Sequence, residues 1–317
     1  MPSSKFSLES IPDLTGKVYL VTGGNTGIGF ATVLGLASHG ATVYMGARSK
    51  EKALPAIEDI KTQTKSGTVH FLQLDLSSFE SVISAARELR RKEEALHGLV
   101  NNAGIMGVPF GKTENGYEVQ FQTNYMSHWL LTYHLLPILT ATSAESPGFA
   151  RIVNVTSDGH ERFPPKGGIK FDDTDLENEG AMTRYGQSKL ANVLHTKELN
   201  HRYGPTSSGL RVAAVHPGHI DTNLNKQATG TAPSAVLRAV TPIMRCIGIL
   251  EDKEKGAWSS LFAIASNDFK ASDSGAYVVP YAKIGTPSAY AQNQGLATKL
   301  WEWTDRELGS KGLLDQI

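Results

Sequence analysis

Residues 17–29 read Lys17-Val18-Tyr19-Leu20-Val21-Thr22-Gly23-Gly24-Asn25-Thr26-Gly27-Ile28-Gly29, an apolar run of strand length that ends in a cluster of glycines. The residues that follow, Phe30 to Ala37, are typical of a helix. In this order, backbone N–H groups at the helix start can face a pyrophosphate, and glycines allow an approach that side chains would block. The stretch predicts a dinucleotide site; the alternative is an ordinary glycine-rich turn.

The rest of the chain repeats the alternation of strand and helix. Further β-rich runs, separated by amphipathic segments, cover residues 41–45, 68–74, 98–100, 151–156, 210–215 and 276–279. Such alternation predicts right-handed crossovers and an α/β fold with a parallel sheet between two layers of helices. Polar or glycine-bearing motifs follow five of these strands, so we expect them to line one crevice at the carboxyl ends.

A tyrosine and a lysine lie four residues apart in Tyr185-Gly186-Gln187-Ser188-Lys189. Residues at this spacing share one face of a helix, so the ammonium can sit beside the phenol. A neighbouring positive charge should lower the pKa of Tyr185, as a general acid or base requires. A tyrosine and a lysine at this spacing are often only a solvated pair. Here the glycine motif in the same chain supports a catalytic role for them.

Five motifs in order resemble those of the short-chain dehydrogenase/reductase family. The glycine turn resembles its TGxxxGxG motif, and Asn101-Asn102-Ala103-Gly104 resembles its NNAG motif. Asn124, Ser157, Tyr185 and Lys189 match its catalytic tetrad, and Pro217-Gly218-His219-Ile220-Asp221-Thr222 resembles its PGxxxT segment. The resemblance implies one doubly wound Rossmann domain over residues 1–317 with a mostly parallel, seven-stranded sheet. Within it we expect an N-terminal extension over 1–15 and a substrate-binding lid over 223–255.

The resemblance also implies roles for individual residues. Hydride would pass between the nicotinamide and a carbonyl or alcohol carbon, with Tyr185 moving the proton and Ser157 stabilising charge on the substrate oxygen. Lys189 would bind ribose hydroxyls and depress the Tyr185 pKa, and Asn124 would hold a water that links Lys189 to solvent. The expected cofactor-binding residues are Gly23, Asn25, Thr26, Gly27, Ile28, Gly29, Arg48, Lys50, Asp75, Leu76, Asn102, Ala103, Gly104, Asn124, Tyr185, Lys189, Pro217, Gly218, Ile220 and Thr222.

The residues after the second predicted strand favour NADP(H) over NAD(H). An acidic side chain there would accept hydrogen bonds from a ribose 2′-hydroxyl, whereas a 2′-phosphate needs positive charge. Residues 42–50 contain Arg48 and Lys50 and no carboxylate. We expect Arg48 to be the main phosphate ligand, with Ser49 or Lys50 in support; the alternative is a solvated helix start.

The segment between Ser157 and Tyr185 spans 27 residues, 158–184, and is longer than in compact members of the family. It includes Phe163-Pro164-Pro165-Lys166-Gly167-Gly168. This insertion resembles the retinol-dehydrogenase-like and protochlorophyllide-reductase-like branch, and it should lie beside the substrate. The resemblance favours a bulky, apolar carbonyl or alcohol substrate.

Composition excludes several other functions. Lys and Arg together equal Asp and Glu at 31 each, so bulk charge does not attract nucleic acid or an anionic membrane. Cys246 is the single cysteine, which excludes an internal disulfide. His216 and His219 lie on either side of a Pro-Gly turn rather than on one face of a helix, so we expect no metal site there. No signal peptide or run of ~18 apolar residues is evident, so we expect a cytoplasmic protein.

Several alternatives stay open. Residues 233–250 could form a lid, a dimer contact or a contact with a membrane surface. A helix bearing Trp301, Trp303 and Leu308 should dock on the body of the chain or on a neighbouring subunit, and a homodimer is one expectation. Two other functions use the same fold: non-redox catalysis by an epimerase, dehydratase or cyclase, and regulation by a dinucleotide-binding protein without turnover.

Overall fold

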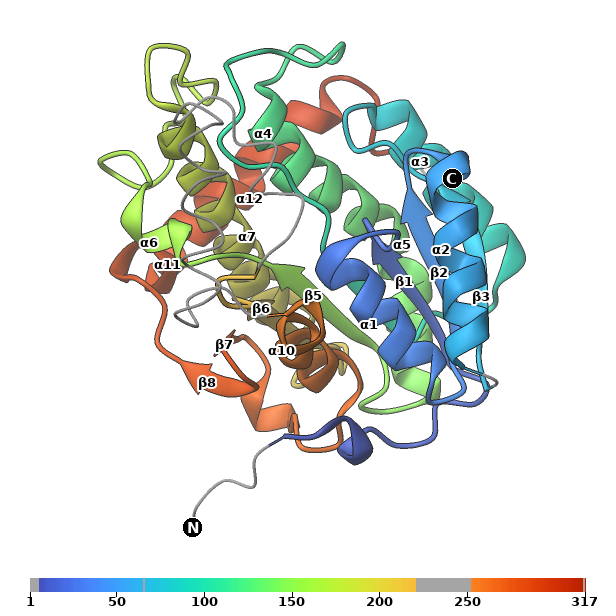
Figure 1. Ribbon diagram of the computed structural model, residues 1–317. Helices are drawn as coiled ribbons and strands as arrows, with labels where there is room; N and C mark the ends of the chain where they lie inside the picture. Colours follow the sequence, from blue (N-terminus) through green and yellow to red (C-terminus); the bar gives the residue numbers. More distant parts are fainter. Residues whose placement is uncertain (1–5, 65, 221–251, 316) are drawn as a thin grey trace.

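The predicted strand before the glycine turn lies inside the sheet of the computed structural model, which describes residues 6–64, 66–220, 252–315 and 317. Within these residues the sheet has the order β3-β2-β1-β4-β5-β6-β7-β8 (Figure 1). The strands are β1 (Val18–Thr22), β2 (Thr42–Ala47), β3 (Thr68–Gln73), β4 (Gly98–Asn101), β5 (Arg151–Val155), β6 (Arg211–Val215), β7 (Ala276–Val279) and β8 (Lys283–Gly285).

β1 pairs with both β2 and β4, so the chain crosses from one half of the sheet to the other between β3 and β4. The first seven strands are parallel, as predicted. The eighth, β8, runs antiparallel to β7 and was not predicted. It has three residues, two of them exposed, and thus lacks the apolar run that identified the other strands.

Helices cover both faces of the sheet. The main helices are α1 (Gly27–Ala37), α2 (Lys50–Gln63), α3 (Phe79–Lys92), α5 (Ser127–Glu145), α7 (Ala181–Tyr203), α10 (Lys253–Ala265) and α12 (Gln294–Gly309). Short helical segments are η1 (Leu8–Ser10), α4 (Val119–Phe121), the π-helix η2 (Gln122–Met126), α6 (Gly159–Arg162), η3 (Ala271–Asp273) and α11 (Ala289–Gln292).

Alternate residues of the strands enter two separate cores, as a two-layered packing requires. Leu20, Leu99 and Ile152 join the core under α3, α5, α7 and α12. The neighbouring residues Val21, Val100 and Val153 join the core under α1, α2 and α10. The doubly wound fold predicted from the alternation is therefore confirmed.

The C-terminal helix α12 docks on the body of the same chain, one of the two alternatives for this segment. Leu308 and Trp301 are buried. The Trp301 ring lies 5.1 Å from that of Trp129 in α5, edge to face. Near the other end of the chain, Phe6 packs against Phe262 of α10, with 5.7 Å between the ring centres.

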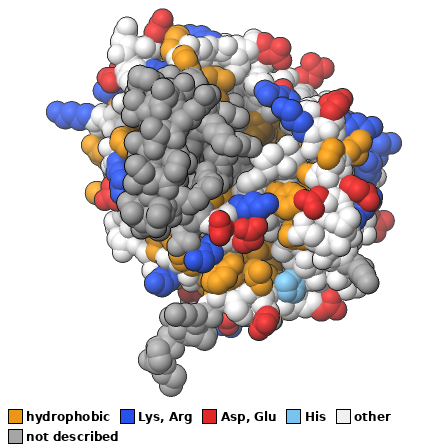
Figure 2. All heavy atoms as spheres, viewed as in Figure 1, with side chains coloured by type: hydrophobic (Ala, Val, Ile, Leu, Met, Phe, Trp, Pro, Cys, Tyr) orange, Lys and Arg blue, Asp and Glu red, His pale blue; other side chains and the backbone are white. Residues whose placement is uncertain are grey.

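Most of the predicted lid over residues 223–255, and all of the 233–250 segment, lie outside the described residues, as do Thr222 and Cys246. Across the part of the chain that is described, no helix is both long and apolar enough to span a bilayer. On the face drawn in Figure 2, basic and acidic side chains are interspersed and do not form a patch of one sign.

Candidate active site

The glycine turn after β1 adopts a backbone that only glycine accommodates easily. Gly23 and Gly27 have φ of +65° and +56°. A Cβ on Gly29 would collide with the carbonyl oxygen of Gly23 and approach Nδ2 of Asn102 to 2.6 Å. Thr26, the N-cap residue of α1, is exposed and makes no side-chain capping bond. The glycines at the N-terminus of α1 therefore carry no side chains that would keep a pyrophosphate from the backbone N–H groups.

The turn is joined to the NNAG motif after β4 by a polar side chain. Thr22 Oγ1 accepts hydrogen bonds from the backbone N–H groups of Asn102 and Ala103, both at 2.9 Å. Asn102 Nδ2 in turn donates to the Thr22 carbonyl oxygen at 2.8 Å. These two motifs thus meet at the point where the strand order reverses, which is where open α/β sheets bind ligands.

The segment after β6 lies beside the glycine turn. Gly218 has a φ of +99°, and Ile220 is buried. A Cβ on Gly256 of α10 would lie 2.8 Å from Cγ1 of Ile220 and 3.0 Å from Cγ1 of Ile28. Ile28 and Ile220, predicted from distant motifs to bind cofactor, therefore converge on one glycine.

The predicted 2′-phosphate ligands lie at the end of β2 and the start of α2, where Arg48 and Lys50 are both exposed. Ser49, predicted with Lys50 to support the phosphate, is the N-cap residue of α2. Its Oγ caps α2 by accepting from the N–H of Lys52 at 3.2 Å and donates to the Glu51 carboxylate at 2.9 Å. Asp75 Oδ1 accepts from the N–H and hydroxyl of Ser77, and Leu76 is buried beside it.

The Tyr185 phenol is buried within α7 and lies close to Ser157, which follows β5. A Cβ on Gly159 would lie 2.9 Å from the Tyr185 ring and 3.4 Å from Ser157 Oγ. Ser157 Oγ donates to Asp158 Oδ1 and accepts from the Gly159 N–H, both at 3.0 Å. Burial raises the pKa of Tyr185 to about 12, although a hydrogen bond with Ser157 lowers it. The phenol of the protein alone therefore stays protonated at neutral pH.

Lys189 lies one helical turn from Tyr185, with its Nζ 5.7 Å from the centre of the Tyr185 ring. Nζ donates to the Val155 carbonyl oxygen at 3.0 Å. Burial lowers the pKa of Lys189 to about 8. The sequence predicted that Lys189 would lower the pKa of Tyr185, and for the groups of the chain itself this is wrong. The loss of hydration on burial outweighs the hydrogen bond with Ser157, which lowers the Tyr185 pKa.

Asn124 lies in the π-helix η2 with its side chain fully engaged by protein groups. Oδ1 accepts from the Ile105 N–H at 2.8 Å, and Nδ2 donates to the Ile105 carbonyl and to Ser188 Oγ, both at 2.9 Å. A Cβ on Gly104 would lie 3.1 Å from Asn124 Oδ1 and 3.3 Å from Lys189 Nζ. Asn124 thus ties the loop after β4 to α7 beside the lysine.

His128 was not predicted from the sequence as a site residue, and the partners of its two ring nitrogens determine its tautomer. The Asn124 carbonyl oxygen can only accept, so in the neutral ring Nε2 is the acceptor and faces the Thr22 hydroxyl at 2.9 Å, closer than the Val100 carbonyl, which lies 3.5 Å from that hydroxyl. Nδ1 then carries the ring proton and donates to the Asn124 carbonyl at 3.0 Å. His128 stands four residues after Asn124, the same spacing that identified the Tyr185–Lys189 pair.

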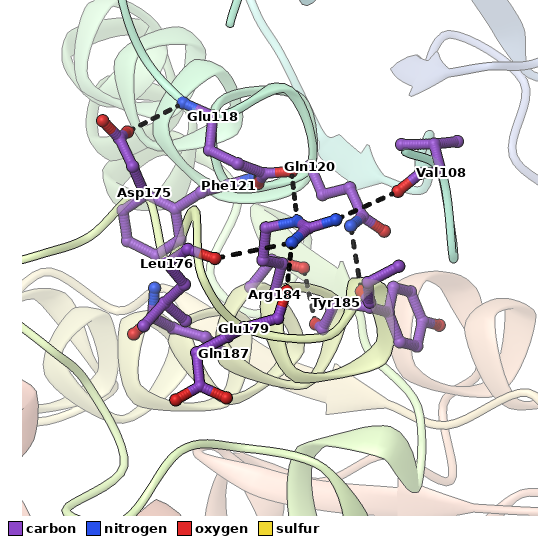
Figure 3. Close-up of polar contacts among 12 residues, drawn as sticks. Val108, Glu118, Gln120, Phe121, Asp175, Leu176, Glu179, Arg184, Tyr185 and Gln187 are labelled. Atoms are coloured by element: carbon purple, nitrogen blue, oxygen red, sulfur yellow. Dashed lines mark hydrogen bonds and ion pairs between the residues drawn. The ribbon is translucent and has the colours of Figure 1, made fainter. Parts of the chain in front are cut away.

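The insertion packs against the catalytic helix. Residues 163–180, which we call the inserted segment, follow α6 and lead into α7. A Cβ on Gly186 would lie 2.6 Å from the backbone of Phe163. Figure 3 shows Arg184 of α7 pointing away from Tyr185 toward carbonyl groups of this segment. The insertion therefore lies against the helix that carries Tyr185 and Lys189; its place beside the substrate stays a prediction.

The two histidines of the Pro-Gly turn, His216 and His219, lie beside each other and near an acidic residue. Their rings lie edge to face, 6.0 Å apart. His219 Nε2 lies 3.5 Å from Asp158 Oδ2, which also pairs with Arg162 at 3.0 Å. No group of three or more potential ligands is found in residues 6–220 and 252–317 as far as they are described.

Comparison with known proteins agrees with this geometry. Residues 17–167 match the family model for short chain dehydrogenases. The short-chain dehydrogenase/reductase drtF of Aspergillus calidoustus is 52% identical over 96% of this chain and 98% of its own length. The chain belongs to the short-chain dehydrogenase/reductase family. Family membership makes it a nicotinamide-dependent oxidoreductase.

A second relative places this family member within a branch. Retinol dehydrogenase 13 of Mus musculus is 36% identical over 93% of this chain and 85% of its own length. The chain is thus a short-chain dehydrogenase/reductase of the retinol-dehydrogenase-like branch. Among solved structures, that of an uncharacterised protein from Mycobacterium paratuberculosis superposes with a TM-score of 0.72 and 28% identity, covering 96% of this chain and 97% of the other.

Proposed function

We propose that this enzyme is NADP(H)-dependent and interconverts the carbonyl and alcohol forms of a bulky, apolar substrate, with Tyr185 as the proton donor or acceptor. The observation that carries the proposal is the convergence of Ser157, Tyr185, Lys189 and Asn124 beside a glycine turn that a dinucleotide fits. The cofactor, when bound, supplies or accepts the hydride.

Each polar residue has a task that its contacts support. Ser157 Oγ lies beside the Tyr185 phenol, so the two hydroxyls can hold one substrate oxygen between them. An ammonium has three donors, and Lys189 uses one on Val155. The remaining donors of Lys189 are suited to ribose hydroxyls. Asn124 keeps the loop after β4 in place, because its amide is bonded to Ile105 and Ser188.

An apolar substrate is supported by the residues that follow the NNAG motif. Residues 105–110, which we call the 105–110 loop, read Ile105-Met106-Gly107-Val108-Pro109-Phe110. Ile105, Met106, Val108 and Phe110 are only partly buried, although apolar side chains usually lie inside. Phe163 of the inserted segment is 38% exposed. These side chains offer apolar surface from the loop bonded to Asn124 and from the segment that packs against Gly186 of α7.

The preference for NADP(H) rests on Arg48 and Lys50 and is tested by binding. Titration should give tighter binding of NADPH than of NADH. Arg48→Ala should weaken NADPH about tenfold or more, the effect of losing one hydrogen bond to a charged group, and should leave NADH unchanged. Lys61→Ala, in the last turn of α2, is the control. Equal affinity of the wild type for both cofactors would contradict the preference.

Turnover is tested with a panel of aldehydes and ketones of increasing size. A reductase consumes one NADPH for each product molecule, whereas an epimerase or cyclase consumes none and a regulator forms no product. We expect stoichiometric consumption, with large apolar carbonyls preferred; turnover restricted to small polar carbonyls would contradict the substrate class. A cytoplasmic location, which the single cysteine favours, remains a prediction. The homodimer also remains a prediction.

A further inference from the structure

Arg184 stands directly before Tyr185 and is buried with its charge. Its guanidinium donates to the carbonyl oxygens of Leu176 and Glu179 in the inserted segment, at 3.4 and 2.5 Å. It also donates to the carbonyl of Val108 in the 105–110 loop at 3.4 Å. Figure 3 shows the guanidinium between these two segments. One side chain therefore joins two stretches of backbone that do not belong to any helix or strand.

The carboxylate opposite Arg184 is Glu118, which is 1% exposed. Arg184 Nε lies 3.4 Å from Glu118 Oε1, and neither atom has a hydrogen-bond partner. Glu118 Oε2 accepts from the Phe121 N–H at 2.7 Å and so holds the start of α4. The pair thus includes a third segment, the turn that leads into the π-helix of Asn124.

Two glutamine side chains also connect these segments to α7. Gln120 accepts from the Gly107 N–H at 2.8 Å and donates to the Ala181 carbonyl at 3.0 Å, so it joins the 105–110 loop to the start of α7. Gln187 accepts from the Lys170 N–H at 2.9 Å and donates to the Thr174 carbonyl at 3.0 Å. The inserted segment is therefore held to α7 by side chains on either side of Tyr185.

A contribution to the stability of the fold does not explain why Arg184 and Glu118 form a buried ion pair. Desolvation of two charges costs as much as their attraction returns, and a hydrophobic pair is often equally stable. What the pair achieves is alignment, because a guanidinium fork has donors in fixed directions and these bind carbonyls from separate segments. The aligned segments are the two that present apolar side chains next to Tyr185 and Ser157.

We propose that Arg184, paired with Glu118, is a positioning residue that holds the inserted segment and the 105–110 loop as opposite walls of the substrate site. It fixes the distance between the walls and thereby the apparent affinity for large substrates. This inference rests on the proposed reductase function. Arg184 takes no part in proton or hydride transfer.

The test replaces the pair without leaving a buried charge. Arg184→Met alone strands the Glu118 carboxylate and can prevent folding. The double variant Arg184→Met/Glu118→Gln avoids this. We expect KM for a large apolar ketone to rise about tenfold or more, with kcat on a small aldehyde and affinity for NADPH changed less than about twofold. Hydrogen exchange should accelerate at the backbone amides of Gly107 and of Lys170.

The matched control is Arg202→Met/Glu198→Gln, a pair on the same helix with 2.8 Å between Nε and Oε1 that binds α12 instead of the inserted segment. It should change neither KM nor exchange at Gly107 and Lys170. Equal loss of kcat/KM on large and small substrates, or unchanged exchange at both amides, would overturn the proposal. If the wild type reduces no carbonyl, the reductase function fails, and hydrogen exchange still decides whether Arg184 holds the two walls.

Discussion

His128 donates a hydrogen bond from Nδ1 to the backbone carbonyl of Asn124, 3.0 Å away, while its Nε2 accepts from Thr22. Because Thr22 also holds the NNAG backbone, this one ring connects the proposed cofactor turn to the tetrad. The connection requires a neutral ring, with one nitrogen donating and the other accepting.

Acid should break this connection and destabilise the fold. Burial lowers the pKa of His128 to about 4, whereas the unfolded chain binds the proton near pH 6.5. The contribution of His128 to the free energy of unfolding is therefore complete above pH 6.5. It falls as the pH drops toward 4, by about 1.4 kcal/mol per pH unit. Denaturation between pH 7 and 4 should show a shallower loss of stability in His128→Gln, which cannot take up the proton.

The control for this measurement is His201→Gln, an exposed residue of α7 that should leave the slope as in the wild type. A slope in His128→Gln equal to that of the wild type would mean that the ring is not the group that resists protonation.

Gly104→Ala should reduce activity more than stability. The added methyl would lie 3.1 Å from Asn124 Oδ1 and 3.3 Å from Lys189 Nζ, so it competes for space with the ammonium. We expect kcat to fall ~10-fold or more, since misplaced polar groups lose their effect on the reacting atoms. Gly111→Ala is the control, because nothing lies within 4 Å of its added methyl. Equal activity of the two variants would contradict the close packing at Gly104.

Gly186→Ala tests the contact between α7 and the inserted segment. Alanine normally stabilises a helix by ~1 kcal/mol relative to glycine. Here the methyl would lie 2.6 Å from the backbone carbonyl carbon of Phe163, so we expect lower stability and a higher KM for large substrates. The control is Gly295→Ala in the first turn of α12, an exposed position where the substitution should be neutral or stabilising. Stabilisation by both substitutions would show that the segment can move away without loss.

Lys189→Met should abolish most activity and yet stabilise the protein. The pKa of Lys189 is lowered to about 8, so folding disfavours its charge at every pH below that value. This cost is complete below pH 8 and disappears as the pH rises toward 10.5. Removing the charge should raise the free energy of unfolding at pH 7 by ~1–3 kcal/mol. The Val155 carbonyl keeps a partner in Asn192 Nδ2 at 3.2 Å.

Chemical denaturation without cofactor measures the effect of Lys189→Met. Lys197→Met, a half-buried position on the same helix, should change stability by less than ~0.5 kcal/mol. A less stable Lys189→Met variant would mean that the ammonium contributes more to the fold through its contacts than burial costs it.

The parts of the fold that sequence predicted are those with a periodic signal. Seven strands follow from β-rich runs. β1 and β5 are buried along their whole length, whereas β3 at the edge of the sheet alternates between exposed and buried residues. β8 has no such run and is an edge strand, so only its pairing with β7 reveals it. The π-helix at Asn124 was also not predicted, since it depends on partners from β1 and α7.

In the candidate site, too, some features were predicted from the sequence and others were not. The order and spacing of Ser157, Tyr185 and Lys189 indicated proximity, which the structure shows. The direction of the Tyr185 pKa was wrong because burial is a property of the packed fold, not of a four-residue spacing. Arg184 was missed for a related reason: a charged residue usually lies at the surface, and only tertiary structure shows that it binds three carbonyls inside.

We expect Tyr185 to transfer the proton and to contribute little to the affinity for the cofactor. The most direct test is NADPH oxidation with the best carbonyl of the panel, in the wild type and in Tyr185→Phe, with NADPH affinity measured for both. We predict that kcat of Tyr185→Phe falls ~10²-fold or more, the usual contribution of a general acid, and that NADPH affinity stays within about threefold. Unchanged turnover by Tyr185→Phe would contradict the account, because the phenol would then have no part in the reaction.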